Sequence, residues 1–167
     1  GNISSQYITG LLLALPHLPG RSQIKILGTL ESKPYVDLSQ QVIRKFGVYS
    51  VPENIPGQSK FHSPGMVMVE GDWSNAAFFL AARALGNQIH TTGLQNNSTQ
   101  GDRAVNSLLP QLKECITISA ADIPDLVPIL SVVAACRKGA VFTDIQRLRL
   151  KESDRVASVI AMLEALG

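Results

Sequence analysis

Charged side chains are concentrated near the carboxyl end of the sequence, in the segment LKESDR at residues 150–155. Lys151 and Arg155 are four positions apart, so both fall on one face of a helix, and Glu152 stands beside them. Two cations and a carboxylate at a helix start could bind an oxyanion and transfer a proton. A charged run of this length is more often a solvated helix start, so the chemical interpretation depends on the rest of the sequence.

A second carboxylate stands at the start of an apolar segment. In DIPD (122–125), Asp122 can cap the helix that follows, which leaves Asp125 about one turn inside it and next to Leu126. A carboxylate so close to a buried helix must be hydrogen-bonded or charge-paired, and such a group is a candidate base. The alternative is that Asp125 is a second capping residue.

Hydroxyl groups open two further predicted helices. SSQ (4–6) precedes one apolar segment, and ESKPYVD (31–37) places Ser32, Lys33 and Tyr35 at the start of another helix. Hydroxyls in these positions can cap the helices. They can also bind phosphate, together with the free N–H groups and the positive end of the helix dipole.

The overall composition excludes several classes of protein. The chain has 167 residues, 45% of them hydrophobic, and a net charge of +2, which is too mild for a dedicated nucleic-acid-binding protein. No metal-ligand spacing is present, and Cys115 and Cys136 lie in apolar sequence, as expected of reduced core cysteines in a cytosolic protein. There is no secretory signal and no apolar run of membrane-spanning length. We therefore expect a soluble cytoplasmic protein without a metal, nucleic-acid or membrane partner.

Three segments are apolar almost all round, and each is followed by a glycine that can end a helix. They are residues 6–18, 75–85 and 125–136. A helix without a polar face must be buried on most sides. We therefore expect Leu12, Phe79 and Leu130 to be nearly fully buried.

Each apolar helix leads into the same succession of elements. A short alternating run follows, typical of a strand with one wet face, and then an amphipathic helix. The runs are residues 22–28, 87–93 and 140–146, and the amphipathic helices are 32–47, 100–112 and 151–167. Lys25 and His90 should face solvent from two of the strands. The recurrence predicts an α/β fold of internal repeats in which the helices lie inside and the sheets cover them, unlike a common parallel α/β fold.

The domain organisation is indicated by local composition. A stretch rich in Pro, Gly and Ser at residues 50–65 is the best candidate for a boundary. The sequence begins about one turn before a predicted helix and stops where the repeat predicts another strand. We therefore expect a fragment of a larger protein.

The clusters together resemble one family. SSQ, SKPYVD, VEGDWSNAAFFLAA, STQGD, IPD and LRLKESDR occur in the order in which 5-enolpyruvylshikimate-3-phosphate synthases carry their equivalents. The resemblance implies that family's fold: enolpyruvyl transferase-like inverted α/β repeats with buried helices and solvent-facing sheets, three repeats in each of two domains. Residues 1–69 would be the last repeat unit of one domain, and residues 70–167 would be two units of the second, incomplete domain.

The resemblance also implies an activity. The family transfers the enolpyruvyl group of phosphoenolpyruvate to the 5-hydroxyl of shikimate 3-phosphate through a tetrahedral adduct and releases phosphate. No cofactor is involved, and we expect the parent protein to be a monomer. By similarity, Ser4, Ser5 and Ser32 would hold the shikimate phosphate, Gln6 would lie between the two substrates, and Tyr35 would line the ring.

The remaining implied site residues come from the second half of the chain. Asp125 would bind the ring hydroxyls and help to take the proton of the 5-hydroxyl. Lys151 would contact shikimate 3-phosphate, Glu152 would exchange the proton on the enol carbon, and Arg155 would bind phosphoenolpyruvate. Two carboxylates suit two proton transfers, and cations with hydroxyls suit two anions.

The sequence departs from the family pattern in three respects. Arg147 stands where the family has an asparagine, and Leu148 replaces the neighbouring aromatic residue. The segment between residues 112 and 122 is shorter than usual. The family's amino-terminal lysine, its carboxy-terminal lysine and several anion-binding arginines are absent, so we expect the chain alone to be inactive. The alternatives are the related UDP-N-acetylglucosamine enolpyruvyl transferase and a non-catalytic anion-binding or structural module.

Overall fold

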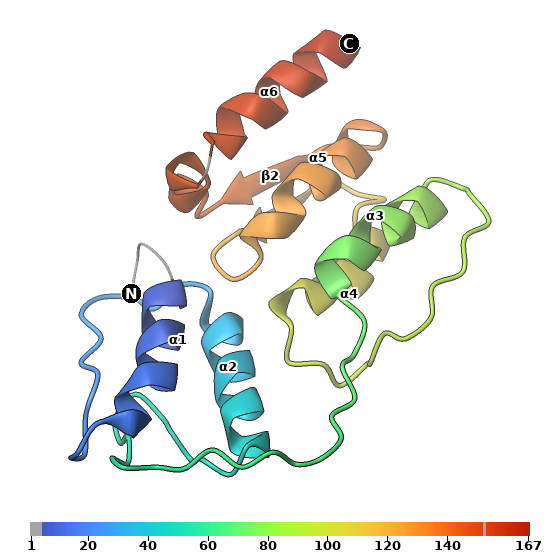
Figure 1. Ribbon diagram of the computed structural model, residues 1–167. Coiled ribbons are helices and arrows are strands. Elements are labelled where there is room, and N and C mark those ends of the chain that lie inside the picture. Colours follow the sequence, from blue (N-terminus) through green and yellow to red (C-terminus); the bar gives the residue numbers. More distant parts are fainter. Residues whose placement is uncertain (1–4, 152) are drawn as a thin grey trace. The chain divides into compact units, whose positions relative to one another are not determined.

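The computed structural model describes residues 5–151 and 153–167 and contains two compact units. Unit 1 comprises residues 1–69 and unit 2 comprises residues 70–167 (Figure 1). Each unit has its own hydrophobic core. Across the described residues, every helix is too short or too polar to cross a bilayer.

Unit 1 is built on two helices that pack side by side (Figure 1). They are α1 (Ser5–Ala14), continued by the 3₁₀ turn η1 (Leu15–His17), and α2 (Lys33–Lys45). Ile8 and Leu12 of α1 meet Val36 and Ile43 of α2 in the core. The Thr9 and Ser39 hydroxyls also meet between the helices, at 3.1 Å.

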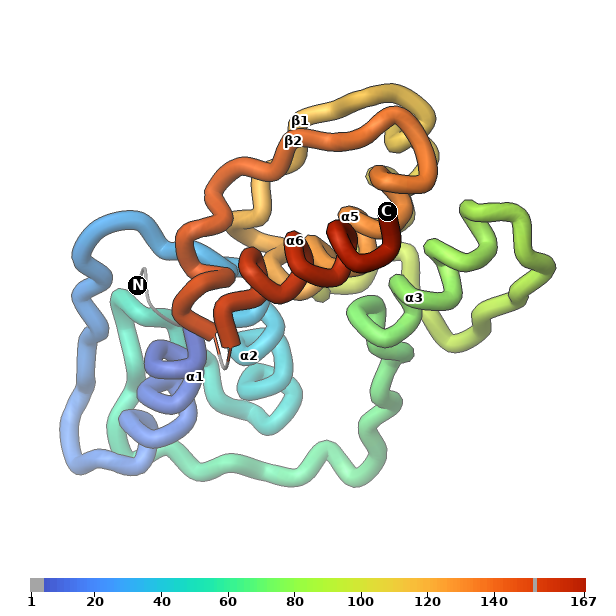
Figure 2. Tube along the Cα trace, turned by 90° about the horizontal axis from the view of Figure 1, so that it is seen from above, coloured from blue at the N-terminus to red at the C-terminus, as the bar shows by residue number. Residues whose placement is uncertain are grey.

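Unit 2 alternates helices with short strands and 3₁₀ turns. In chain order its elements are α3 (Trp73–Ala84), η2 (Gly101–Ala104), α4 (Val105–Gln111), β1 (Ile116–Ser119), η3 (Pro124–Leu126), α5 (Val127–Ala135), β2 (Ala140–Thr143), η4 (Gln146–Leu150) and α6 (Arg155–Leu166). β1 and β2 form a parallel pair in which Ile116 is opposite Ala140. Figure 2 shows the two strands side by side, with α5 and α6 next to each other.

Capping interactions explain where the helices of unit 2 begin and end. The Asp72 carboxylate accepts hydrogen bonds from the backbone N–H groups of Ser74 and Asn75, which fixes the start of α3. The Arg137 guanidinium donates to the Ala84 carbonyl at the end of α3 and, at 2.9 Å, to the Leu109 carbonyl in α4. A cation in this position satisfies carbonyls that have no partner within their own helix.

The predicted helices are confirmed, but two of the three predicted strands are wrong. Residues 140–143 form β2, whereas 87–93 form no strand and 22–28 contribute an isolated bridge between Ser22 and Ile55. A strand exists only through pairing, and alternation of side chains does not supply a partner. The structure therefore has the predicted α/β class, with a small parallel sheet. The inverted repeat stays a prediction.

Two of the three apolar helices, α1 and α3, are buried along one face, and not on most sides as the sequence suggests. Leu12 and Leu130 are fully buried, and Lys25 and His90 are exposed, as predicted. Phe79 is 55% exposed, so its predicted burial is wrong. The buried face of α3 consists of Trp73, Ala76, Ala77, Leu80 and Ala81, spaced as one helical stripe, and Phe79 points away from it.

The cysteine prediction is only half right. Cys115 and Cys136 are free thiols, as expected, but both are exposed and neither belongs to the core. Cys115 lies in the turn between α4 and β1, and Cys136 directly follows the last residue of α5. Apolar neighbours in the sequence do not bury a residue that falls on a turn.

Candidate functional site

An ion pair joins two of the predicted site residues in unit 2. Asp125 lies in η3, directly before the buried helix α5, and Arg155 is the first residue of α6. The Arg155 guanidinium donates to the Asp125 carboxylate, and the two side chains are 27% and 31% exposed. The carboxylate is therefore charge-paired, as its place beside a buried helix required.

The position of Arg155 is set by the cap of α6. The Asp154 carboxylate accepts a hydrogen bond from the Ala157 N–H at 3.0 Å and another from Arg149 at 2.9 Å. The Ala157 bond, with help from Arg149, lowers the pKa of Asp154, so the cap is charged at neutral pH. Lys151 is half-buried between η4 and this cap. A helix start in LKESDR is thus confirmed, but α6 begins only at Arg155. Lys151 lies before the helix with an extended backbone, so the prediction that Lys151 and Arg155 share a helix face is wrong.

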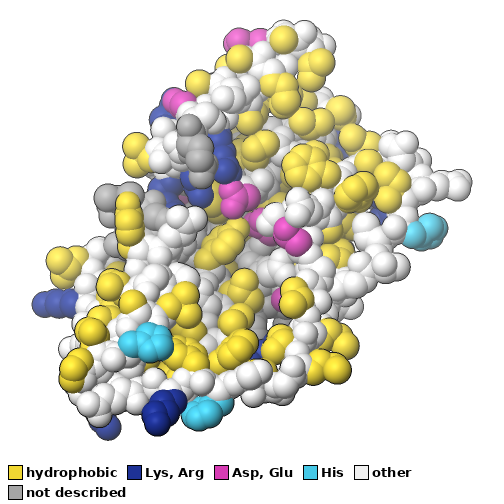
Figure 3. Space-filling model, viewed as in Figure 1, with side chains coloured by type: hydrophobic (Ala, Val, Ile, Leu, Met, Phe, Trp, Pro, Cys, Tyr) yellow, Lys and Arg dark blue, Asp and Glu magenta, His cyan; other side chains and the backbone are white. Residues whose placement is uncertain are grey.

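A third carboxylate near these residues was not predicted. Asp102 lies in η2 and is 1% exposed, and its Oδ2 accepts a hydrogen bond from the Ser74 hydroxyl of α3. Burial raises the pKa of Asp102 to about 6, against the opposing effect of the Ser74 bond. Asp125 and Asp72 raise this pKa further and Lys151 lowers it, so Asp102 lies within electrostatic reach of two predicted site residues. Figure 3 shows acidic side chains at the centre of this face, the upper of them next to basic side chains.

The two residues that depart from the family pattern, Arg147 and Leu148, are both buried. Arg147 is 6% exposed and Leu148 is fully buried, both within η4. The Arg147 Nε atom has no hydrogen-bond partner among the described residues, although the side chain makes other interactions. A long cation therefore occupies the interior of the turn that precedes Lys151.

The predicted residues of unit 1 gather at the starts of its two helices. Ser5 is buried in the first turn of α1 and Gln6 is exposed beside it. Ser32 is 2% exposed and precedes α2 with a φ of 54°, a left-handed conformation that non-glycine residues seldom adopt. Its hydroxyl does not cap α2, and Tyr35 is half-buried one turn later. Both helices begin at the same end of unit 1 (Figure 1).

Two predicted site residues, Ser4 and Glu152, lie outside the described residues. The structure pairs Asp125 with Arg155, and both Asp125 and Lys151 act electrostatically on Asp102. Their roles stay predictions. Asp102 belongs to STQGD, which carries part of the resemblance, but nothing in those five letters indicates a buried carboxylate.

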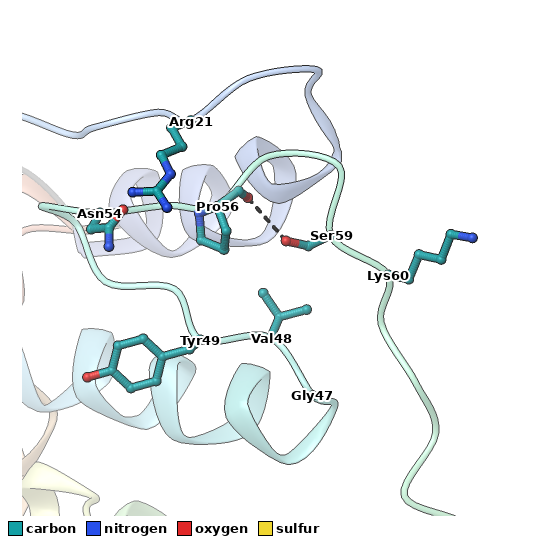
Figure 4. Close-up of a pocket in the computed structure, with 8 residues that line it drawn as sticks. All are labelled: Arg21, Gly47, Val48, Tyr49, Asn54, Pro56, Ser59 and Lys60. Carbon is teal, nitrogen blue, oxygen red and sulfur yellow. Dashed lines mark hydrogen bonds between the residues drawn. The ribbon is translucent and has the colours of Figure 1, made fainter.

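A pocket of about 350 Å³ in unit 1 lies elsewhere. Figure 4 shows Arg21 and Asn54 on one wall, Tyr49 on the other, and Lys60 pointing away. The Ser59 hydroxyl donates to the Pro56 carbonyl at 3.2 Å across its rim. None of the predicted site residues described by the structure lines this pocket.

Comparison with known proteins identifies the family to which the chain belongs. The family model of EPSP synthase (3-phosphoshikimate 1-carboxyvinyltransferase) matches residues 1–120. The chain belongs to the EPSP synthase family. Among relatives named 3-phosphoshikimate 1-carboxyvinyltransferase, those of Clostridium beijerinckii, Clostridium novyi and Cronobacter sakazakii are 40%, 38% and 36% identical to it, in each case over 100% of the chain.

The chain is much shorter than these EPSP synthases. It spans 43–45% of the length of the three relatives. The alignments extend over 190–192 positions, more than the 167 residues of the chain, so the relatives carry additional residues inside the matched region.

Proposed function

We propose that the chain forms part of a 3-phosphoshikimate 1-carboxyvinyltransferase. This enzyme would transfer the enolpyruvyl group of phosphoenolpyruvate to the 5-hydroxyl of shikimate 3-phosphate and release phosphate, in the cytoplasm and without a cofactor. The observation that carries the proposal is the 36–40% identity to enzymes of that name over the whole chain. Unit 1 would be the last repeat unit of one domain, and unit 2 would be two repeat units of the other.

Unit 2 would supply the proton-transfer groups and two cations. Asp125 would bind the ring hydroxyls and accept the 5-hydroxyl proton as the oxygen attacks C2 of phosphoenolpyruvate. Glu152 would deliver a proton to the methylene carbon, which becomes a methyl group in the tetrahedral adduct, and would remove one again as phosphate leaves. Lys151 would hold shikimate 3-phosphate and Arg155 would hold phosphoenolpyruvate. Fixed cations stabilise the developing negative charge without reorganisation.

Unit 1 would supply further contacts to shikimate 3-phosphate. Ser4, Ser5 and Ser32 would donate hydroxyl hydrogen bonds to its phosphate, at helix starts whose dipoles favour an anion. Gln6, which is exposed, would lie between the substrates, and Tyr35 would pack on the ring. The left-handed Ser32 supports this assignment, because strained residues cluster at functional sites and its hydroxyl is not a helix cap.

A chimaera tests the proposal directly. In it, this chain replaces the matching segment of the Clostridium beijerinckii relative, and circular dichroism confirms that the product folds. We expect phosphate release that requires both phosphoenolpyruvate and shikimate 3-phosphate, and none from the 167-residue chain alone. Release with UDP-N-acetylglucosamine in place of shikimate 3-phosphate would favour the related transferase. A folded chimaera that binds neither anion in calorimetry would contradict both assignments.

A further inference from the structure

Asp102 is the most deeply buried carboxylate among the described residues of unit 2 and has no role in the proposed mechanism. One of its oxygens, Oδ2, accepts from the Ser74 hydroxyl. The other, Oδ1, is buried and has no hydrogen-bond partner among the described residues. A buried carboxyl oxygen without a donor is unfavourable, and native proteins keep few such groups without a reason.

The elements around Asp102 determine which charges it experiences. η2 packs against α3 and α4. α3 contributes the Ser74 hydroxyl and, from its cap, the Asp72 carboxylate, whereas α4 (VNSLLPQ) carries no charge. Asp125 acts on Asp102 from η3, and Lys151 acts on it from the turn before α6. The adjacent Arg103 donates to the Asn96 carbonyl at 2.6 Å instead.

Two carboxylates, Asp125 and Asp72, thus act on the buried carboxyl group of Asp102, and one cation, Lys151, opposes them. Because burial and the two like charges raise the pKa of Asp102 to about 6, its charge changes between mildly acidic and neutral pH. Loss of the proton from Asp102 therefore adds one negative charge that acts on Asp125 and Lys151. In a water-poor interior such a charge acts more strongly than at the surface.

We propose that Asp102 is a positioning residue of the transferase site, a buried carboxyl group whose ionisation weakens the hold of Lys151 on shikimate 3-phosphate. Its effect on substrate rests on the proposed function; its coupling to Asp125 and Lys151 does not. An ionised Asp102 competes with shikimate 3-phosphate for the Lys151 ammonium and repels the incoming anion. A protonated Asp102 does neither.

The coupling is tested by NMR on the 167-residue chain with ¹³C-labelled aspartate. We expect the Asp102 carboxyl to titrate near pH 6, at lower pH in Asp125→Asn, and at higher pH in Lys151→Gln and Ser74→Ala. Glu114→Gln is the matched control, because Glu114 pairs with Lys138 and is exposed. A titration in the ordinary aspartate range near 4, or one that neither Asp125→Asn nor Lys151→Gln moves, would overturn the proposal.

The effect on substrate is tested in the chimaera with Asp102→Asn, which keeps the side chain uncharged. A phosphate monoester also ionises near pH 6, so the ratio of KM for shikimate 3-phosphate between wild type and variant is measured at each pH. We expect a ratio near one at pH 5 that rises about 3- to 10-fold by pH 7.5, with kcat little changed. A ratio that does not depend on pH, or a loss confined to kcat, would reduce Asp102 to a structural residue. A chimaera without activity whose Asp102 still titrates as expected would contradict the proposed function and leave the coupling standing.

Discussion

The Arg155 guanidinium and the Asp125 carboxylate are bonded to each other across 30 positions of the sequence. The pair links the first residue of α6 to the turn before α5. The position of Arg155, the proposed phosphoenolpyruvate-binding cation, therefore depends on that of Asp125, the proposed proton acceptor. A substrate anion that binds Arg155 would have to compete with Asp125 for it. The arrangement makes the two proposed functions interdependent.

The Asp125–Arg155 pair should contribute to folding through mutual interaction. We expect a coupling free energy of about 1 kcal/mol from a double-mutant cycle of Asp125→Asn and Arg155→Met, measured by urea unfolding, because both side chains are mostly buried. The exposed pair Lys138–Glu114 is the control and should couple by less than about 0.5 kcal/mol. Equal coupling in the two pairs would show that burial of the first adds nothing.

The proton-transfer assignment predicts large losses of turnover. In the chimaera, Asp125→Ala and Glu152→Ala should each lower kcat by about 10²–10⁴, the usual effect of a positioned acid or base. Glu164→Ala, at the far end of α6, should leave kcat unchanged. Phosphate release is the measurement. Turnover close to wild type in Glu152→Ala would remove that residue from the mechanism.

Adjacent leucines in α1 should differ sharply in their contribution to stability. Leu12 is 0% exposed and Leu13 is 47% exposed. Leu12→Ala should lower the free energy of unfolding by about 2–5 kcal/mol through lost burial and a residual cavity, and Leu13→Ala by less than about 1 kcal/mol. Denaturant unfolding followed by circular dichroism tests both. Similar losses at the two positions would mean that α1 is covered on both faces.

Two glycines in unit 1 should respond to alanine with opposite signs. A Cβ atom at Gly57 would collide with the Gly20 carbonyl group and lie 2.8 Å from the Leu18 carbonyl oxygen. Gly57→Ala should therefore destabilise unit 1 by about 1–3 kcal/mol. A Cβ atom at Gly10, inside α1, meets nothing within 4 Å, so Gly10→Ala should stabilise the helix by about 0.5–1 kcal/mol. Thermal unfolding distinguishes the two, and a stabilising Gly57→Ala would refute the close approach.

Asp102 should make stability depend on pH in an unusual direction. Its pKa rises from 3.8 to about 6 on folding, so the folded state holds a proton that the unfolded state has lost. Stability should therefore fall as pH rises from about 4 to 6, by about 3 kcal/mol in total, and then level off. Asp102→Asn should remove this slope. Urea unfolding at several pH values is the measurement, and an unchanged slope in the variant would assign the effect to another group.

Sequence patterns predicted the helices, but two of the three predicted strands are wrong, for a physical reason. The apolar stripe of α5 and the capping residue of α6 are local, so they can be recognised in the chain itself. The run at 87–93 has the alternation of a strand but pairs with no strand among the described residues. The prediction that Phe79 is buried was wrong for a related reason. The rest of unit 2 determines which face of α3 is covered, and the sequence of α3 alone does not show it.

The same distinction separates the predicted site residues from Asp102. Lys151 and Arg155 belong to the charged segment LKESDR, and Asp125 stands at the start of an apolar segment, so the sequence itself singles them out. Asp102 is unusual only through its burial and its neighbours, and these come from 28 residues earlier, at Ser74, and from Asp125 and Lys151 later in the chain. Only the folded chain brings these groups together.

The hydrophobic clusters of the chain have a thermodynamic consequence. One cluster is formed entirely by unit 1 and the other two entirely by unit 2. The segment that joins the units exposes Met66, Met68 and Val69 almost fully and contributes to none of them. Because each cluster lies within one unit, we expect the denaturation curve of the intact chain to contain two cooperative transitions, each with its own midpoint and its own heat-capacity step.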